Sequence, residues 1–132
     1  MAAAEGDLLV VRFSPATVEG LASDAEDSAA DCEAASEPIV YSVSAFGMVK
    51  GTDDSDDDLV IQICEDAPVG GKTIFTTTDV ALATQGFGLV LSEPPQRHYN
   101  VTLGAKLDIE DIKRLSALFQ LGRRRNPAWK KP

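Results

Sequence analysis

The amino-acid sequence predicts an α+β domain, built on a largely antiparallel sheet of about five strands. Two main helices, at about 15–35 and 109–121, are expected to cover one face of this sheet. Short apolar segments separated by turn signals indicate the strands. A serine-proline pair and a capped amphipathic segment indicate the two helices. The 132 residues fit one domain, which we expect over 1–122, followed by a basic C-terminal tail at 123–132.

The first two elements are a strand and a helix. Residues 7–13 (DLLVVRF) are aliphatic enough to predict a central strand. Ser14 and Pro15 suit the N-cap and N1 positions, so the helix is expected to begin there and to run to about Ser36. Its apolar positions, which repeat about every 3.6 residues, are Val18, Leu21, Ala22, Ala25, Ala29 and Cys32.

An acidic segment separates the next two elements. The pattern of residues 39–49 predicts a strand, and the apolar run 59–64 (LVIQIC) predicts its partner in a hairpin. The segment 50–58 between them carries five aspartates: Asp53, Asp54, Asp56, Asp57 and Asp58. Because these carboxylates repel one another and bring no apolar side chain to bury, we expect an exposed, mobile acidic loop.

Short elements continue the sheet in the second half. Residues 73–77 predict a short strand, and residues 79–84 predict a helical turn. Strands are expected at 87–91 and 97–103, on either side of two consecutive prolines. In the second of these strands His98, Asn100 and Thr102 alternate with Tyr99, Val101 and Leu103, which predicts one polar face and one buried face.

Several signals agree on the last helix, at 109–121. Asp108 occupies the N-cap position, and Leu107 and Ile112 have the spacing of a hydrophobic staple. Gly122 stands just beyond the last helical residue, where glycine is common. The expected core stripe consists of Ile112, Leu115, Leu118 and Phe119.

The net charge of −9 is unevenly distributed along the chain. Residues 1–66 carry sixteen acids and two bases, whereas residues 67–132 carry five acids and ten bases. The overall excess of acid disfavours nucleic acid as a partner, because phosphates must be neutralised by cations. The sequence shows no apolar span of membrane-helix length and no signal-peptide pattern, so we expect a cytoplasmic protein with no membrane partner and two reduced cysteines.

Several motifs that would imply a cofactor or a metal are incomplete. Residues 68–73 (PVGGKT) end like a phosphate-binding loop, but Asp66 stands where its first glycine is required. The aspartates of 53–58 lack the glycine and the glutamate of an EF-hand loop. Cys32 and Cys64, with one histidine in the chain, form no zinc-binding set. Beside Glu65 and Asp66, the pKa of Cys64 is expected to be raised. We therefore expect neither a cofactor nor a metal.

His98 is the catalytic candidate, because histidine commonly transfers protons near neutral pH. Together with Arg97, Tyr99 and a carboxylate such as Glu93, it would suit phosphodiester or acyl chemistry if these side chains met in a cleft. A histidine on the exposed face of a strand gives the same pattern, and no nucleophile elbow surrounds Ser92. A small hydrolytic enzyme is therefore one alternative function.

The C-terminal tail is a second candidate site. Its binding residues are Arg123, Arg124, Arg125, Trp129, Lys130 and Lys131. Cations and an aromatic ring can bind nucleic acid through phosphates and base stacking, which is another alternative. The tail can equally dock on the acidic surface at 19–37 and 53–58, within a chain or between the subunits of a homo-oligomer. A disordered solubilising tail is the simplest interpretation.

The function expected first is that of a non-enzymatic protein–protein interaction module. Its acidic body would bind a basic protein partner, as an inhibitor, immunity protein or accessory protein does, with fast and salt-sensitive association. The binding residues expected on the protein are the five aspartates of the acidic loop and the six residues of the tail. Acidity alone does not identify the partner.

Overall fold

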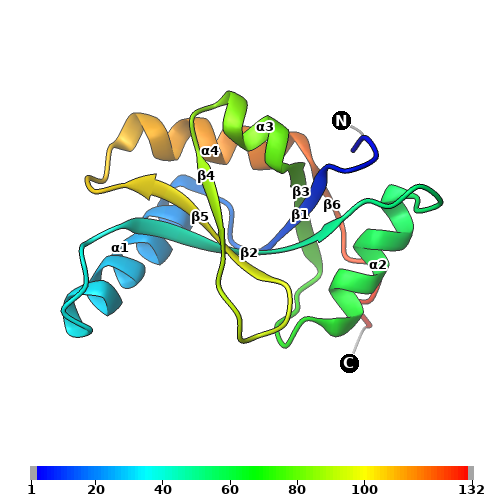
Figure 1. The fold of residues 1–132 in the computed structure, drawn as a ribbon, viewed down its shortest axis with the longest axis horizontal. Coiled ribbons are helices and arrows are strands. Elements are labelled where there is room, and N and C mark those ends of the chain that lie inside the picture. Colours follow the sequence, from blue (N-terminus) through cyan, green and yellow to red (C-terminus); the bar gives the residue numbers. More distant parts are fainter. Residues whose placement is uncertain (1–2, 131–132) are drawn as a thin grey trace.

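The computed structural model describes residues 3–130. Their secondary structure consists of β1 (Leu8–Phe13), α1 (Val18–Ala34), β2 (Tyr41–Val49), α2 (Asp56–Asp66), β3 (Thr73–Thr78), α3 (Asp79–Thr84), β4 (Gly88–Leu91), β5 (His98–Gly104), α4 (Ile109–Leu121) and β6 (Arg123–Arg125). The six strands form one sheet in the order β4-β5-β2-β1-β3-β6, in which every neighbouring pair is antiparallel (Figure 1). The α+β class is confirmed, with six strands where about five were expected.

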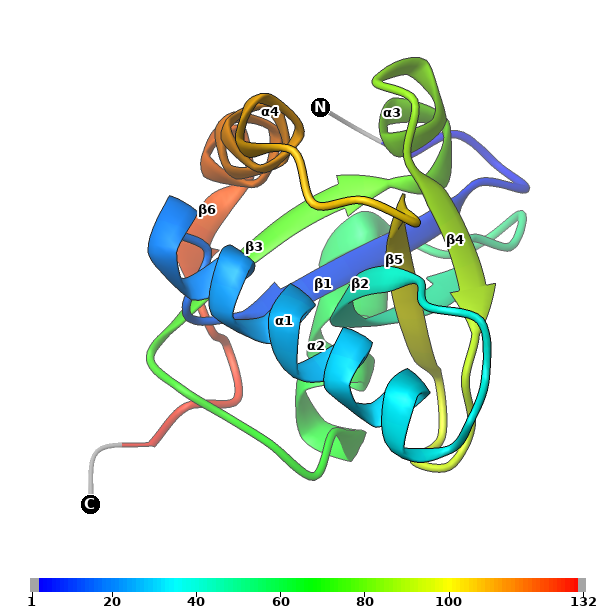
Figure 2. The same ribbon diagram turned by 90° about the vertical axis from the view of Figure 1, so that its left-hand side faces the viewer.

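The sheet separates two apolar clusters. Helices α1, α3 and α4 supply the helical side chains of one cluster, whereas α2 supplies those of the other. Figures 1 and 2 show α3 and α4 above the sheet and α2 below it. The first and last helices thus contribute to the same apolar cluster, as expected, and α2 provides an additional cover on the opposite side.

The central position of β1 explains its aliphatic sequence. All six of its residues are buried. Leu8 and Val10 belong to the cluster with α1 and α4, whereas Leu9, Val11 and Phe13 belong to the cluster with α2. A strand covered on both faces needs apolar side chains in both directions, which a continuous apolar run supplies.

The segment 59–64 is helical, so the expected strand and hairpin are wrong. Ser55 is the N-cap of α2, and its Oγ accepts the N–H of Asp58 at 3.1 Å. The next three residues, Asp56, Asp57 and Asp58, form the first turn, where the helix dipole favours carboxylates. These three aspartates therefore belong to α2 and not to the acidic loop expected at 50–58.

Helix α1 begins one turn later than expected. Its N-cap is Thr17, whose Oγ1 accepts the N–H of Gly20 at 3.1 Å, and not Ser14. The segment before the helix folds back against this first turn. A Cβ atom at Gly20 would lie 2.5 Å from Cγ of Pro15, so glycine is needed for this close approach.

Helix α4 has the expected bounds and N-cap, and the chain after it continues the sheet. Asp108 accepts the N–H of Glu110 at 2.8 Å. Gly122 ends the helix and accepts the N–H of Thr76 through its carbonyl oxygen at 2.9 Å. A Cβ at Gly122 would lie 1.8 Å from the carbonyl oxygen of Thr76, so only glycine fits here. Residues 123–125 then pair with β3 and do not leave the domain as a tail.

Among the residues that the structure describes, no helix combines the length and the apolarity needed to cross a bilayer.

Candidate functional site

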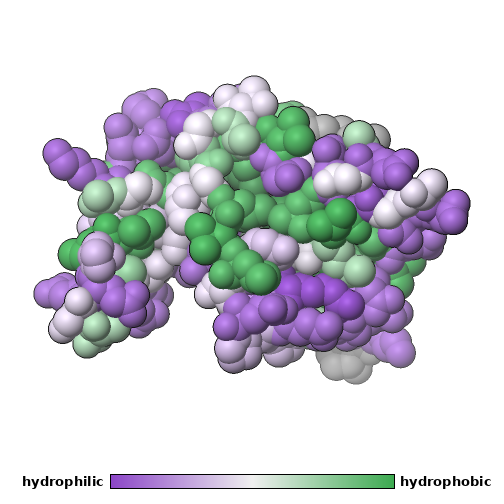
Figure 3. Space-filling view, in the orientation of Figure 1, coloured by the Kyte–Doolittle hydropathy of each residue, from purple (hydrophilic) through white to green (hydrophobic). Residues whose placement is uncertain are grey.

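A groove lies between α1 and the sheet, and we call it the α1 groove. It consists of two adjoining hollows of about 420 and 460 Å³, which share Asp24, Asp27 and Ser44. Figure 3 shows the surface notched between the lobe that α1 forms and the rest of the molecule. The two hollows together follow the length of the helix.

One stripe of α1 forms a wall of the groove. The lining residues of this helix and its C-cap are Gly20, Ser23, Asp24, Asp27, Ser28, Asp31, Cys32 and Ala35. Their separations of three or four residues place them on one helical face. The acids Glu19, Glu26 and Glu33, which recur every seven residues, line neither hollow. The acidic residues of α1 are thus divided between the groove and the opposite face.

The opposite wall of the groove comes from β2 and β5. Ser44 pairs with Asn100 across these strands, so the side chains of the two residues lie on the same face. The hydroxyl groups of Ser42 and Ser28 are 2.6 Å apart and join this wall to α1. The groove therefore offers hydroxyl and amide groups opposite the carboxylates of α1.

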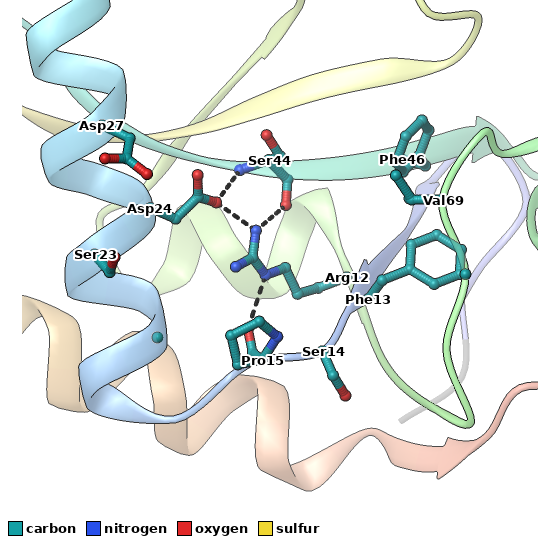
Figure 4. A pocket seen from close by; sticks show the side chains of 12 residues that line it. Arg12, Phe13, Ser14, Pro15, Ser23, Asp24, Asp27, Ser44, Phe46 and Val69 are labelled. Atoms are coloured by element: carbon teal, nitrogen blue, oxygen red, sulfur yellow. Dashed lines mark hydrogen bonds and ion pairs between the residues drawn. The ribbon is translucent and has the colours of Figure 1, made fainter.

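An ion pair between the buried Arg12 and the half-buried Asp24 connects the two walls (Figure 4). Arg12 Nη1 donates to Asp24 Oδ2 at 2.5 Å and to the carbonyl oxygen of Ser44 at 2.8 Å. Asp24 Oδ2 also accepts the N–H of Ser44 at 3.0 Å. The pairing of β1 with β2 ends at Val11 and Phe46, so no neighbouring strand lies beside Ser44 on this edge of β2. The side chains of Arg12 and Asp24 take the place of that strand and bond the carbonyl oxygen and the N–H of Ser44.

The charge of the groove is negative. Asp27, Asp31 and Glu37 line it and are exposed, and none of them forms an ion pair with a cation of residues 3–130. Arg12 is the one lysine or arginine of the described chain that lines either hollow, and Asp24 already neutralises it. Three carboxylates are therefore free to attract a cation.

The residues expected around a catalytic His98 do not meet. His98 lines the groove, its ring centroid lies 5.4 Å from that of Phe46, and its Nδ1 lies 3.0 Å from the carbonyl oxygen of Ser92. Tyr99 packs against the cluster on the other face of the sheet. Arg97 pairs with Asp66 outside the groove.

Glu93 and Asp66 are both engaged with Arg97. Glu93 Oε2 accepts the backbone N–H of Arg97 at 2.9 Å, and the guanidinium of Arg97 donates to Asp66. Hydrogen bonds from Gln62 and Arg97 hold the pKa of Asp66 below its ordinary value. Of the four candidates for a catalytic group, His98 is the one that lines the groove.

The expected binding residues of the acidic loop and of the tail lie away from the groove. Arg124 Nη1 pairs with Asp57 at 2.8 Å, so a contact between the basic segment and the acidic body is present within one chain. The guanidinium carbon of Arg125 lies 5.1 Å and Lys72 Nζ 5.9 Å from the ring centre of Trp129. Asp56 is half-buried and pairs with Lys50 at 2.7 Å. Asp53, Asp54, Asp58, Arg123 and Lys130 are exposed, and Lys131 lies outside the described residues.

The two cysteines are free thiols on different helices. Burial raises the pKa of Cys64 to about 11, and the nearby charge of Arg124 opposes this rise only in part. A raised pKa was expected from the neighbouring carboxylates, but burial, and not Glu65 or Asp66, is what raises the pKa. The described part of the chain contains no group of three or more histidine, cysteine or acidic side chains that could hold a metal ion.

Sequence reasoning named the acidic surface at 19–37 but missed the groove within it. The missed residues are Arg12, Asp24, Asp27 and Asp31, with Ser44 on the opposite wall. A usable signal was present, because the acids at 24, 27 and 31 share one helical stripe and those at 19, 26 and 33 share another. The wall formed by β2 and β5 depends on strand pairing, which helical spacing does not reveal.

Comparisons of this chain with models of protein families, with curated proteins and with solved structures gave no match.

Proposed function

We propose that the protein is a non-enzymatic interaction module whose α1 groove binds a lysine- or arginine-rich segment of a protein partner. One observation carries this proposal. Asp27, Asp31 and Glu37 lie along a single groove without a neutralising cation from the described chain. Carboxylates in a concave surface attract cations more strongly than the same carboxylates spread over a convex one, because the low-dielectric walls focus their field.

The spacing of the acids suits an extended peptide. Asp27 and Asp31 are four residues apart on α1, which corresponds to a rise of about 6 Å. Alternate side chains of an extended strand are separated by about 6.6 Å. Two basic side chains on one side of such a segment therefore match the two carboxylates, and serine hydroxyls beside them can accept further hydrogen bonds.

Binding is favoured over hydrolysis because of what surrounds His98. Neither Arg97 nor Tyr99 lines the groove with it, and Nδ1 of His98 already faces the carbonyl oxygen of Ser92. The hydrolytic and nucleic-acid alternatives stay predictions.

A matched pair of triple variants tests the proposal. The groove variant is Asp27→Asn/Asp31→Asn/Glu37→Gln, and the control is Glu19→Gln/Glu26→Gln/Glu33→Gln. Both variants remove three negative charges. The groove variant removes two from α1 and one from the segment after it, all in the groove, whereas the control removes three from the part of α1 outside the groove. At roughly 0.5 kcal/mol for each exposed pair, the groove variant is expected to bind basic peptide about tenfold more weakly.

The probe is a fluorescently labelled peptide of eight lysines, titrated at about 0.1 M salt and followed by anisotropy. The control variant is expected to bind within about threefold of the unmodified protein, because at this salt concentration charges beyond roughly 10 Å are largely screened and the control acids lie outside the groove. Equal losses in the two variants would show that net charge, and not the groove, governs binding. Equal affinity of all three proteins would end the proposal as well.

A further inference from the structure

The β4 edge of the sheet is apolar and uncovered. Val90 and Leu91 of this end strand are each 54% exposed. Figure 3 shows apolar side chains gathered over β4 at the front of the molecule. The opposite edge, β6, consists of Arg123–Arg125. Charged residues commonly protect an edge strand from pairing with other chains, and β4 (GLVL) carries none.

The register of the sheet decides which backbone groups of β4 face outward. The N–H of Ser92 donates to the carbonyl oxygen of His98 at 2.8 Å, and Val90 lies opposite Asn100. Because hydrogen-bonded pairs alternate along antiparallel strands, Val90 points its backbone groups at β5, whereas Leu89 and Leu91 point theirs away from it. Within the described residues, no hydrogen bond outside the sheet satisfies these outward groups.

We propose that β4 pairs antiparallel with β4 of a second copy of the chain, across a two-fold axis at Val90. In this register Leu89 faces Leu91 of the second copy, and Leu91 faces its Leu89. Both pairs are hydrogen-bonded pairs, so they supply four backbone hydrogen bonds in total. At the axis Val90 lies opposite Val90 of the second copy. The two residues form a non-hydrogen-bonded pair, in which the side chains approach most closely.

Charge complementarity favours a second copy over another partner. Glu93 and Phe87 are equally distant in sequence from Val90, so the pairing places Glu93 opposite Phe87 of the second copy. The guanidinium carbon of Arg114 lies 5.1 Å from the centre of the Phe87 ring. Arg114 Nη2 pairs with Asp111 of its own chain at 3.1 Å, and Nε donates to the carbonyl oxygen of Gln85, whereas Nη1 has no partner among residues 3–130. Each copy can therefore place the exposed carboxylate of Glu93 beside Nη1 of the other copy's Arg114, and the two-fold axis repeats the match.

The dimer is expected to be weak. An edge of four residues falls short of the roughly 800 Å² per partner of a standard interface. Dissociation is therefore expected at micromolar concentration and association towards about 1 mM.

Pairing would form one continuous sheet with both α1 grooves on the same side, since opposite residues of antiparallel strands share a face. The inference does not depend on what the grooves bind.

Sedimentation equilibrium over a range of concentrations tests the pairing. The unmodified protein is expected to rise from 14.0 kDa towards twice that mass as concentration increases. Val90→Lys is expected to remain monomeric, and Val80→Lys is the control, because Val80 on α3 is also 54% exposed. Leu91→Pro is expected to fold normally and to remain monomeric, because proline removes an outward N–H. Constant monomer mass up to about 1 mM, or equal effects of the two lysine variants, would overturn the proposal.

A charge exchange tests the register and the identity of the partner. Glu93→Arg is expected to weaken the dimer several-fold, and the double variant Glu93→Arg/Arg114→Glu is expected to restore it. Failure of the double variant to associate better than Glu93→Arg would contradict the two-fold pairing. Masses beyond that of a dimer would contradict it too, because they indicate open-ended pairing of β4 with another surface.

Discussion

Arg12 shows how one buried side chain can hold three segments of the chain together. Its guanidinium donates to the carboxylate of Asp24 on α1, to the carbonyl oxygen of Ser44 on β2 and to that of Pro15 before α1. The side chain of Arg12 is 7% exposed, so it depends on these partners for most of its hydrogen bonds. The residue fixes α1 against the sheet and thereby sets the width of the groove.

Arg12→Met is expected to lower the free energy of unfolding by about 3 kcal/mol, because it removes the ion pair of Asp24 and the side-chain donor of two carbonyl groups, and leaves Asp24 with the N–H of Ser44 alone. Urea denaturation measures the loss. Lys113→Met is the control, because Lys113 and its ion-pair partner Glu110 are both exposed. This variant is expected to change the free energy of unfolding by less than about 0.5 kcal/mol. Similar losses in both variants would show that Arg12 is no more than a surface cation.

At the scale of elements, the N-terminus of α2 anchors the start of the chain. Asp56 in its first turn accepts a hydrogen bond from Lys50 Nζ at 2.7 Å and another from the N–H of Ala3 at 3.0 Å. Burial raises the pKa of Asp56, but these hydrogen bonds outweigh it and bring the pKa below its ordinary value of 3.8. The ionised carboxylate therefore stabilises the folded state.

The sign of this shift predicts a pH dependence. A depressed folded-state pKa contributes stability above the unfolded value of 3.8 and loses it as the pH falls through the folded value. Asp56→Asn is expected to cost about 1 kcal/mol at neutral pH and almost nothing in acid, measured by urea denaturation at about pH 7 and about pH 2.5. Asp53→Asn is the control, because the side chain of Asp53 has no hydrogen-bond or ion-pair partner among residues 3–130. A cost that persists unchanged in acid would exclude the carboxylate as its source.

Helices α4 and α2 show what sequence could and could not predict about the elements. For α4, the N-cap, the staple and the apolar stripe all indicated a helix, and its bounds are confirmed. For α2, an apolar run of six residues fits a strand as well as a helix because it is short. The helical spacing of its buried residues, which are Leu59, Val60, Ile63 and Cys64, becomes visible only in the structure. Ser55 followed by acids was the deciding signal for a helix start, but it was interpreted as part of a loop.

The candidate site was less predictable than the fold. His98 could be named because it is the single histidine, and it does line the groove. Its partners could not be named, because the groove joins α1 to β2 and β5 through contacts such as Ser28 with Ser42 and Arg12 with Ser44. Such contacts depend on where β1 stops pairing with β2, and local sequence patterns do not encode that point.

At the scale of the whole molecule, the acidic and basic parts of the sequence are partly interleaved in space. Asp57 and Asp66 of α2 pair with Arg124 and Arg97 from the second half of the chain. Among the acids of α1, Asp24 alone has an ion-pair partner in the described chain. The other five acids of α1, which are Glu19, Glu26, Asp27, Asp31 and Glu33, therefore leave this helix with an unbalanced negative charge.

This distribution predicts opposite effects of salt on the two proposed interactions. Raising the ionic strength from about 0.05 M to about 0.5 M screens attraction between charges and is expected to weaken peptide binding in the groove several-fold. The same change weakens the two exposed Glu93–Arg114 pairs slightly, but it screens the repulsion between two copies of net charge −9 more strongly and is therefore expected to strengthen the dimer. Anisotropy titration and sedimentation measure the two trends. If both trends have the same sign, one of the two assignments is wrong.

The strand order has a consequence for synthesis on the ribosome. The sheet grows outward from β1, since β2 and β3 flank β1 and the later strands β5 and β6 add outside them. Strand β4 is the exception, because it is made before β5, its one neighbour. At roughly 5–20 residues per second, the segment from Leu91 to Gly104 takes about 1 s to make. For that interval a nascent chain carries an apolar strand whose place in the sheet does not yet exist.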